Sequence, residues 1–86
     1  MTTVIVLHKW SDAQRSEFDG FAKSILGLAK EGKLPKGLQL KEVLLAKGRN
    51  VAICKWEVDS LEHLMQVTSS MKPSWNVEAY EVTSAY

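Results

Sequence analysis

His8 is the ionisable side chain best placed to handle a proton, because it ends an otherwise apolar segment near the N-terminus. An imidazole with a pKa of about 6.5 can serve as a general base or a ligand near neutral pH. Alternation along an extended segment puts His8 on one face with Val4, Val6 and Trp10. We therefore treat His8 as the candidate catalytic residue. The alternative is a half-exposed histidine at the rim of a sheet, hydrogen-bonded to backbone.

Lys55 and Glu57 are spaced two residues apart, which puts them on the same face of an extended segment. One interpretation is an acid and a base that line a pocket. The interpretation we favour is a cross-strand ion pair with Lys41 or Glu42 on a neighbouring strand.

Aromatic side chains form a second candidate group, because several at strand positions can wall a cavity for a planar organic molecule. The alternative is that they belong to the core or to a dimer contact. His63, next to Glu62 in a predicted helix, is a further pocket candidate whose alternative is a solvated side chain. The candidate aromatic pocket residues are Trp10, Phe18, Trp56, Trp75 and Tyr80.

Metal and cofactor chemistry have no motif in this chain. The two histidines lack a partner at ligand spacing, and no zinc-type Cys/His cluster is present. Cys54 lies within an apolar strand segment, where a free cysteine usually acts as a small buried hydrophobe. The five glycines match no phosphate-binding loop. We expect no metal and no cofactor.

Length and charge narrow the classes of protein. The chain has 86 residues and a formal net charge of +1, which predicts one domain over residues 1–86 and no overall attraction to nucleic acid. The longest N-terminal apolar run, residues 4–7, is too short for a membrane span or a signal peptide, so we expect a cytoplasmic protein. A domain this small has a marginal core, and one cysteine cannot form an internal disulfide. Unusually good packing or a second subunit would supply the missing stability.

Hydrophobic spacing predicts six elements. Strands are expected over residues 2–10, 38–47, 51–58 and 75–82. A helix is expected over residues 12–31, with Ser11 and Gln14 as a capping box, and a second helix is expected between Asp59, as its cap with Glu62, and Pro73. Gly20 and Gly27, seven residues apart, indicate close approach of another backbone to the first helix.

Strict alternation in the second strand places Leu38, Leu40 and Leu44 on one face and Val43 and Leu45 on the other. The first and third strands likewise carry apolar residues on both faces.

The element order βαββαβ predicts an α+β, ferredoxin-like domain, with a four-stranded antiparallel sheet and two helices on one face. The helices cover only one face, so the other apolar face would stay exposed, and patches of this kind mark interfaces. We expect a homodimer in which the two sheets face each other.

This order, the chain length and the apolar second face resemble the dimeric α/β-barrel superfamily. The segments 34–38 (LPKGL), 51–59 (VAICKWEVD) and 78–82 (EAYEV) also look like small ferredoxin-like families of the same size. The superfamily includes muconolactone-isomerase-like proteins, stress-responsive barrel proteins, cofactor-free monooxygenases and haem-degrading monooxygenases. In the haem-degrading branch an Asn, a Trp and a His share a pocket. Trp56 and His63 resemble the last two, whereas the first strand offers His8 in place of Asn.

Two functions follow as expectations. The resemblance to muconolactone-isomerase-like members implies a pocket between sheet and helices and draws attention to His8, Lys55 and Glu57. In the first function, such a pocket binds a small apolar or aromatic ligand, as in a cofactor-independent monooxygenase or isomerase with His8 as the proton-handling group. In the second, the protein is a non-enzymatic interaction module that assembles through its sheet face. A cavity beside His8 favours the first, and a filled interior favours the second.

Overall fold

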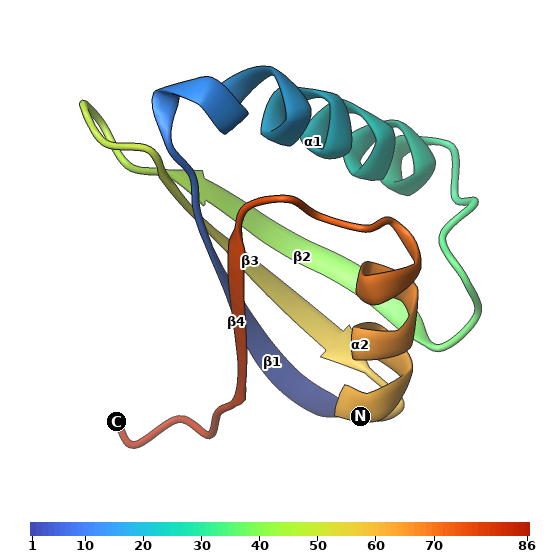
Figure 1. Ribbon diagram of the computed structural model, residues 1–86. Coiled ribbons are helices and arrows are strands. Elements are labelled where there is room, and N and C mark those ends of the chain that lie inside the picture. Colours follow the sequence, from blue (N-terminus) through green and yellow to red (C-terminus); the bar gives the residue numbers. More distant parts are fainter.

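A computed structural model describes all 86 residues of the chain as an α+β fold (Figure 1). The predicted order of elements is confirmed and is consistent with a ferredoxin-like arrangement. A turn of 3-10 helix over Asp12–Gln14 leads into the first α-helix. The elements are β1 (Thr2–Lys9), α1 (Arg15–Lys30), β2 (Leu38–Leu45), β3 (Val51–Val58), α2 (Leu61–Ser70) and β4 (Asn76–Glu81).

The four strands form one sheet in the order β2-β3-β1-β4, and every neighbouring pair is antiparallel. The first and third strands are therefore central, and β2 and β4 are the edges. Ile25 of α1 and Leu64 of α2 both pack in one cluster with Val4 and Val6 of β1, so the two helices cover the same side of the sheet. We call this side the inner face and the opposite side the outer face.

The inner face is the core of the protein. The cross-strand pairs Val4↔Trp56 and Val6↔Cys54 lie at its centre, and these four side chains are at most 6% exposed. Leu64 is 1% exposed and covers them from α2. Every second side chain of β1 points to the inner face, and these side chains are buried because the helices cover that face.

The edge strand β2 departs from the predicted alternation. Its register against β3 shifts between Leu40 and Glu42, where a bulge accommodates Lys41. Val43 then pairs with inner-face Cys54, while Leu44 pairs with outer-face Ile53. The prediction that Leu40 and Leu44 share a face is wrong, because one inserted residue inverts the side-chain directions that follow it.

The second helix begins one residue later than predicted. Ser60, not Asp59, is its N-cap, and the Ser60 hydroxyl accepts a hydrogen bond from the His63 backbone N–H at 3.1 Å. At the first helix the expected contact of the capping box is present, since the Ser11 backbone N–H donates to Gln14 Oε1 at 2.9 Å. By accepting from the third residue of α2, the Ser60 hydroxyl satisfies a backbone N–H that has no partner within the helix.

The interpretation of the two glycines in α1 is also wrong. A side chain added at Gly20 or Gly27 would meet no atom within 4 Å, so neither residue makes room for another backbone. Gly37 is different, because it has φ +93° and an added Cβ would collide with the carboxylate of Asp59. Glycine is required there, before β2, by both backbone conformation and space.

Neither helix of the protein is long and apolar enough to cross a membrane.

Candidate functional site

His8 lies in an aromatic cluster between the sheet and the N-terminal half of α1. Its ring centroid is 5.5 Å from that of Phe18, 5.4 Å from that of Phe21 and 6.3 Å from that of Trp75. It projects from the inner face of β1, paired with Ala52 on one side and Val77 on the other. His8 is only 2% exposed, so it is a buried core histidine and not a residue of the sheet rim.

The imidazole of His8 is held by a side-chain hydrogen bond. Trp75 Nε1–H donates to His8 Nδ1 at 3.0 Å, and indole nitrogen can only donate. The bond therefore assigns the neutral tautomer with its proton on Nε2. Burial lowers the pKa of His8 from 6.5 to about 4, because a charged imidazolium would lose its hydration. His8 is thus an uncharged acceptor at neutral pH.

The rest of the cluster closes the space around His8. Trp10 stacks on Phe18 with ring centroids 3.8 Å apart and planes 8° apart, and Trp75 meets Phe18 edge-on at 87°. Trp10 Nε1 is buried and has no hydrogen-bond partner. Stacked and edge-on rings fill volume efficiently. The interior beside His8 is therefore occupied by the protein's own rings.

Phe21 was not among the predicted site residues, although it contacts both His8 and Trp75, with centroids 5.2 Å apart in the second contact. Its signal was present in the helical pattern, because residues three apart lie on one side of a helix and Phe18 is in the cluster. The helical pattern does not say that Phe18 and Phe21 contact His8, because that contact depends on the tertiary fold.

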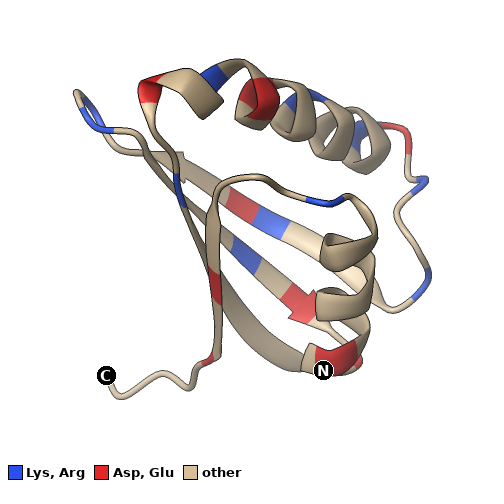
Figure 2. Cartoon of the chain, in the orientation of Figure 1, with Lys and Arg blue, Asp and Glu red and all other residues tan.

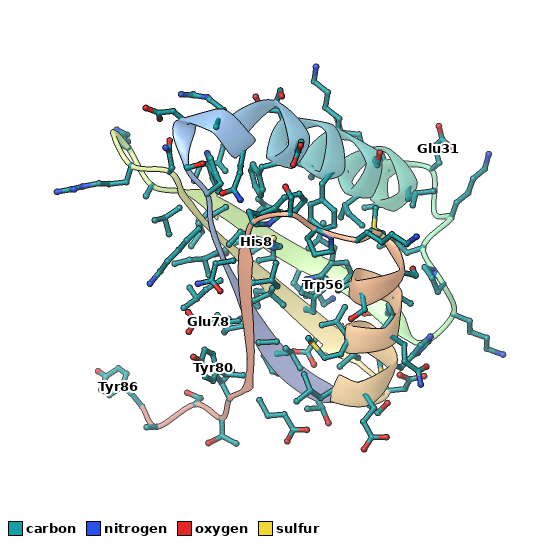
Figure 3. The ribbon with its side chains drawn as sticks, in the orientation of Figure 1. His8, Glu31, Trp56, Glu78, Tyr80 and Tyr86 are labelled. Carbon is teal, nitrogen blue, oxygen red and sulfur yellow. The ribbon has the colours of Figure 1, made fainter.

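The predicted site residues separate into four places, namely the cluster around His8, the main core, the outer face and α2. Trp10, Phe18 and Trp75 gather around His8, while Trp56 belongs to the main core under α2 and Ile25. Figure 3 shows Glu78 and Tyr80 projecting from β4 on the side away from His8 and Trp56. The remaining predicted residues are Lys55 and Glu57 on the outer face and His63 on α2.

The favoured ion pair of Lys55 or Glu57 is absent. Lys55 lies opposite Glu42 in the sheet register, but their charged groups form no salt bridge within 4.0 Å. Glu57 instead accepts a hydrogen bond from Thr3 Oγ1 at 2.6 Å. An open hollow of about 800 Å³ lies here, bounded by the strand ends and the C-terminal residues, and Lys55 and Ile5 are in its wall. Lys55 and Glu57 are thus on the opposite side of the sheet from His8.

His63 pairs with Asp59 at the start of α2. Its Nδ1 is 2.9 Å from Asp59 Oδ1 and 3.1 Å from Oδ2. This hydrogen bond, with smaller help from the Ser60 backbone N–H, lowers the pKa of Asp59. The pair lies beside the N-cap at the start of α2 and is not part of the aromatic cluster.

Cys54 is buried in the centre of the sheet, as predicted. Burial raises the pKa of its thiol to about 11, because a thiolate would be poorly solvated there. A thiol that stays protonated is a weak nucleophile, so Cys54 acts as a small hydrophobe. No group of three or more His, Cys, Asp or Glu side chains is arranged to hold a metal ion.

Comparison of the chain with family models, curated proteins and solved structures gives no match. Proposals about function therefore depend on the chemistry and packing of the two faces of the sheet.

Proposed function

We propose that the protein is a non-enzymatic interaction module that assembles as a homodimer through the outer face of its sheet. The observation that carries this proposal is a band of apolar side chains on a face that no helix covers. In this band Leu44 is 51% exposed and Tyr80 is 50% exposed.

The band is continuous across the sheet. Leu44 pairs with Ile53 and Ile53 pairs with Leu7, so one row of aliphatic side chains crosses β2, β3 and β1. Ile5 and Tyr80 form the next pair and extend the band to β4. A contiguous apolar patch of this kind is typical of protein interfaces, whereas isolated apolar residues are common on any surface.

The charged residues around the band suit a second copy of the chain. Lys9 and Lys55 share the outer face with Glu42, Glu57 and Glu78. Figure 2 shows an acidic and a basic position on each of β2 and β3. A two-fold axis brings the same patch of each subunit together, so a patch with both signs can pair with itself.

The packing around His8 favours this module over an enzyme. A proton-handling residue must come within hydrogen-bond reach of its substrate. His8 is 2% exposed, Nδ1 is already bonded to Trp75, and aromatic rings surround it.

Sedimentation equilibrium of the purified protein tests the dimer. We expect a species of twice the 9.6 kDa chain mass at micromolar concentration. Leu44→Asp puts a charge in the exposed apolar band and should raise the dissociation constant at least tenfold. Ser24→Asp, an equal charge change at an exposed position of α1, is the matched control and should leave it unchanged. A stable 9.6 kDa species in the wild type at this concentration would refute the proposal.

A second candidate function, binding of a planar aromatic molecule by a cofactor-independent monooxygenase or isomerase, is supported by one observation. Trp75 orients the neutral imidazole of His8 among aromatic rings, which could host such a molecule if Phe18 and Phe21 moved aside. Titration with 1-naphthol, followed by tryptophan fluorescence, tests it. Saturable binding that His8→Ala abolishes would support this function, and no binding by the wild type would end it.

A further inference from the structure

An apolar groove follows the seam between α1 and the edge strand β2. It consists of two adjoining hollows of about 320 and 400 Å³ that share Ala29, Leu40 and Lys41 as lining residues. Other apolar side chains along the groove are Leu26, Leu34, Leu38 and Val43. The groove lies at the β2 edge of the sheet and meets the proposed dimer face at Glu42.

On the strand side the groove is lined by the first part of β2, from Leu38 to Val43, and Leu45 lies beyond it. Leu38, at the start of the strand, is 5% exposed, whereas Leu45, further along the same inner-face row, is 65% exposed. The bulge at Lys41 contributes, since it turns Val43 and Leu45 toward the helix side. On the facing side of α1, Leu26 is 38% exposed.

Lysines surround this apolar floor. Lys30 and Lys41 line the groove, and neither has a carboxylate within 4.0 Å, whereas the nearby Lys33 is paired with Glu31 at 3.3 Å. Figure 2 shows basic positions at the end of α1 and in the loop that follows. Glu42 is the one acidic residue in the lining. The groove therefore combines apolar side chains with two lysines that form no salt bridge.

We propose that this groove binds a free long-chain monocarboxylate, with the alkyl chain along the floor and the carboxylate at Lys30 and Lys41. The volumes of the two hollows are in the range of small-molecule sites, roughly 300–1,000 Å³. An alkyl chain gains from leaving water for an apolar surface, and an ammonium group attracts the carboxylate.

Two other occupants fit less well. A peptide added as a fifth strand would have to pair with β2, whose ladder is interrupted by the bulge and whose edge bears Lys41. Bulges and edge lysines are features that block strand addition. A second copy of the chain would place a patch with two lysines and one glutamate against the same patch, and this unbalanced charge does not complement itself.

Titration of the ¹⁵N-labelled wild-type protein with dodecanoate, below its micelle concentration, tests the site. We expect saturable shifts of the amides of β2 and of the second half of α1. Dodecyltrimethylammonium has the same chain and the opposite charge, and butyrate has the head group with a short chain. Both should bind at least tenfold more weakly. Equal binding of the cationic amphiphile, or no saturable shift with dodecanoate, would overturn the proposal.

Charge-reversal variants locate the carboxylate. Lys30→Glu combined with Lys41→Glu should weaken dodecanoate binding at least tenfold. Lys23→Glu combined with Lys47→Glu changes the net charge equally at exposed positions outside the lining and should have little effect. Equal losses in both double variants would contradict a site at Lys30 and Lys41.

Paired leucine variants locate the alkyl chain. Leu26→Gln should weaken binding several-fold, whereas Leu44→Gln, on the outer face, should not. Loss of binding in Leu44→Gln and not in Leu26→Gln would move the ligand to the outer face. This inference goes beyond the proposed function, and sedimentation of the same samples reports the dimer separately, so either can fail alone.

Discussion

The two faces of the sheet are built from neighbouring residues of the same strands but meet different surroundings. On β1, Val4, Val6 and His8 are at most 3% exposed, whereas Ile5 and Leu7 between them remain partly exposed. Both sets are mainly apolar. The difference comes from the helices, which cover only the inner face.

Burial changes the chemistry of a residue as much as its type does. His8 on the inner face is neutral and bonded to an indole, and the pKa of Cys54 is raised to about 11. The outer face keeps Lys55 and Glu57 partly hydrated. The inner face therefore serves stability, and the outer face is available for assembly.

The largest effect is expected in the core. Leu64→Ala removes a side chain that is 1% exposed, and the cavity should lower the free energy of unfolding by about 2–5 kcal/mol. Urea denaturation followed by circular dichroism measures it. A loss below about 1 kcal/mol would show that α2 does not seal the inner face as described.

Acid should weaken the fold through His8. Its pKa is about 4 in the folded protein and 6.5 in the ordinary state expected of the unfolded chain. Between these pH values His8 binds protons more readily in the unfolded chain than in the folded protein. The stabilisation of the fold by neutral His8 is therefore complete above pH 6.5 and is lost as pH falls toward 4. The loss amounts to about 3 kcal/mol.

Urea denaturation at several pH values measures this dependence. In His8→Phe the pH dependence of the free energy of unfolding that is due to His8 should vanish. His63→Gln is the control and should retain this pH dependence. An unchanged slope in His8→Phe would contradict the assignment to the inner face.

The hydrogen bond between Trp75 and His8 should contribute a smaller amount. A double-mutant cycle with His8→Phe and Trp75→Phe should give a coupling free energy of about 1 kcal/mol, since the partners are 3.0 Å apart and buried. Each single variant leaves the other polar side chain unpaired in the core. Each should therefore lower the free energy of unfolding by more than the coupling free energy. Additive effects would mean that the two side chains do not interact.

The smallest effect is expected on the outer face. Leu44→Ala, 51% exposed, should change the free energy of unfolding by less than about 0.5 kcal/mol when measured at a concentration where the chain is monomeric. Leu44→Ala and Leu64→Ala are the same substitution on opposite sides of the sheet, so their effects on stability can be compared directly. Equal losses in the two variants would erase the distinction between the faces.

Much of the fold was predictable because each element carries a local signal. A β-branched run in β1 and helical spacing in α1 are such signals, and Cys54 was expected to be buried. The faces of β2 were not predicted, because a bulge at Lys41 leaves no clear mark in the local pattern. The N-cap of α2 was missed by one residue, since Asp59 and Ser60 are both good caps.

The candidate site was predicted only in part. Phe18 and Trp75 do meet His8, and Trp10 joins them by stacking on Phe18. Phe21 was missing from the prediction, and Lys55, Glu57 and Tyr80 are on the other face. Residue type suggested an aromatic pocket. Whether rings enclose a cavity or fill it depends on their mutual packing, which no local spacing reports.

Periodicity and local propensity are enough to fix the α+β class, the order of the six elements and the apolar character of both sides of the sheet. Only the tertiary structure decided that His8 is closed in by aromatic rings and bonded to Trp75, 67 residues away. It also decided that α1 leaves an open groove along β2. The physical reason is that burial, pKa and grooves depend on which distant segments pack together.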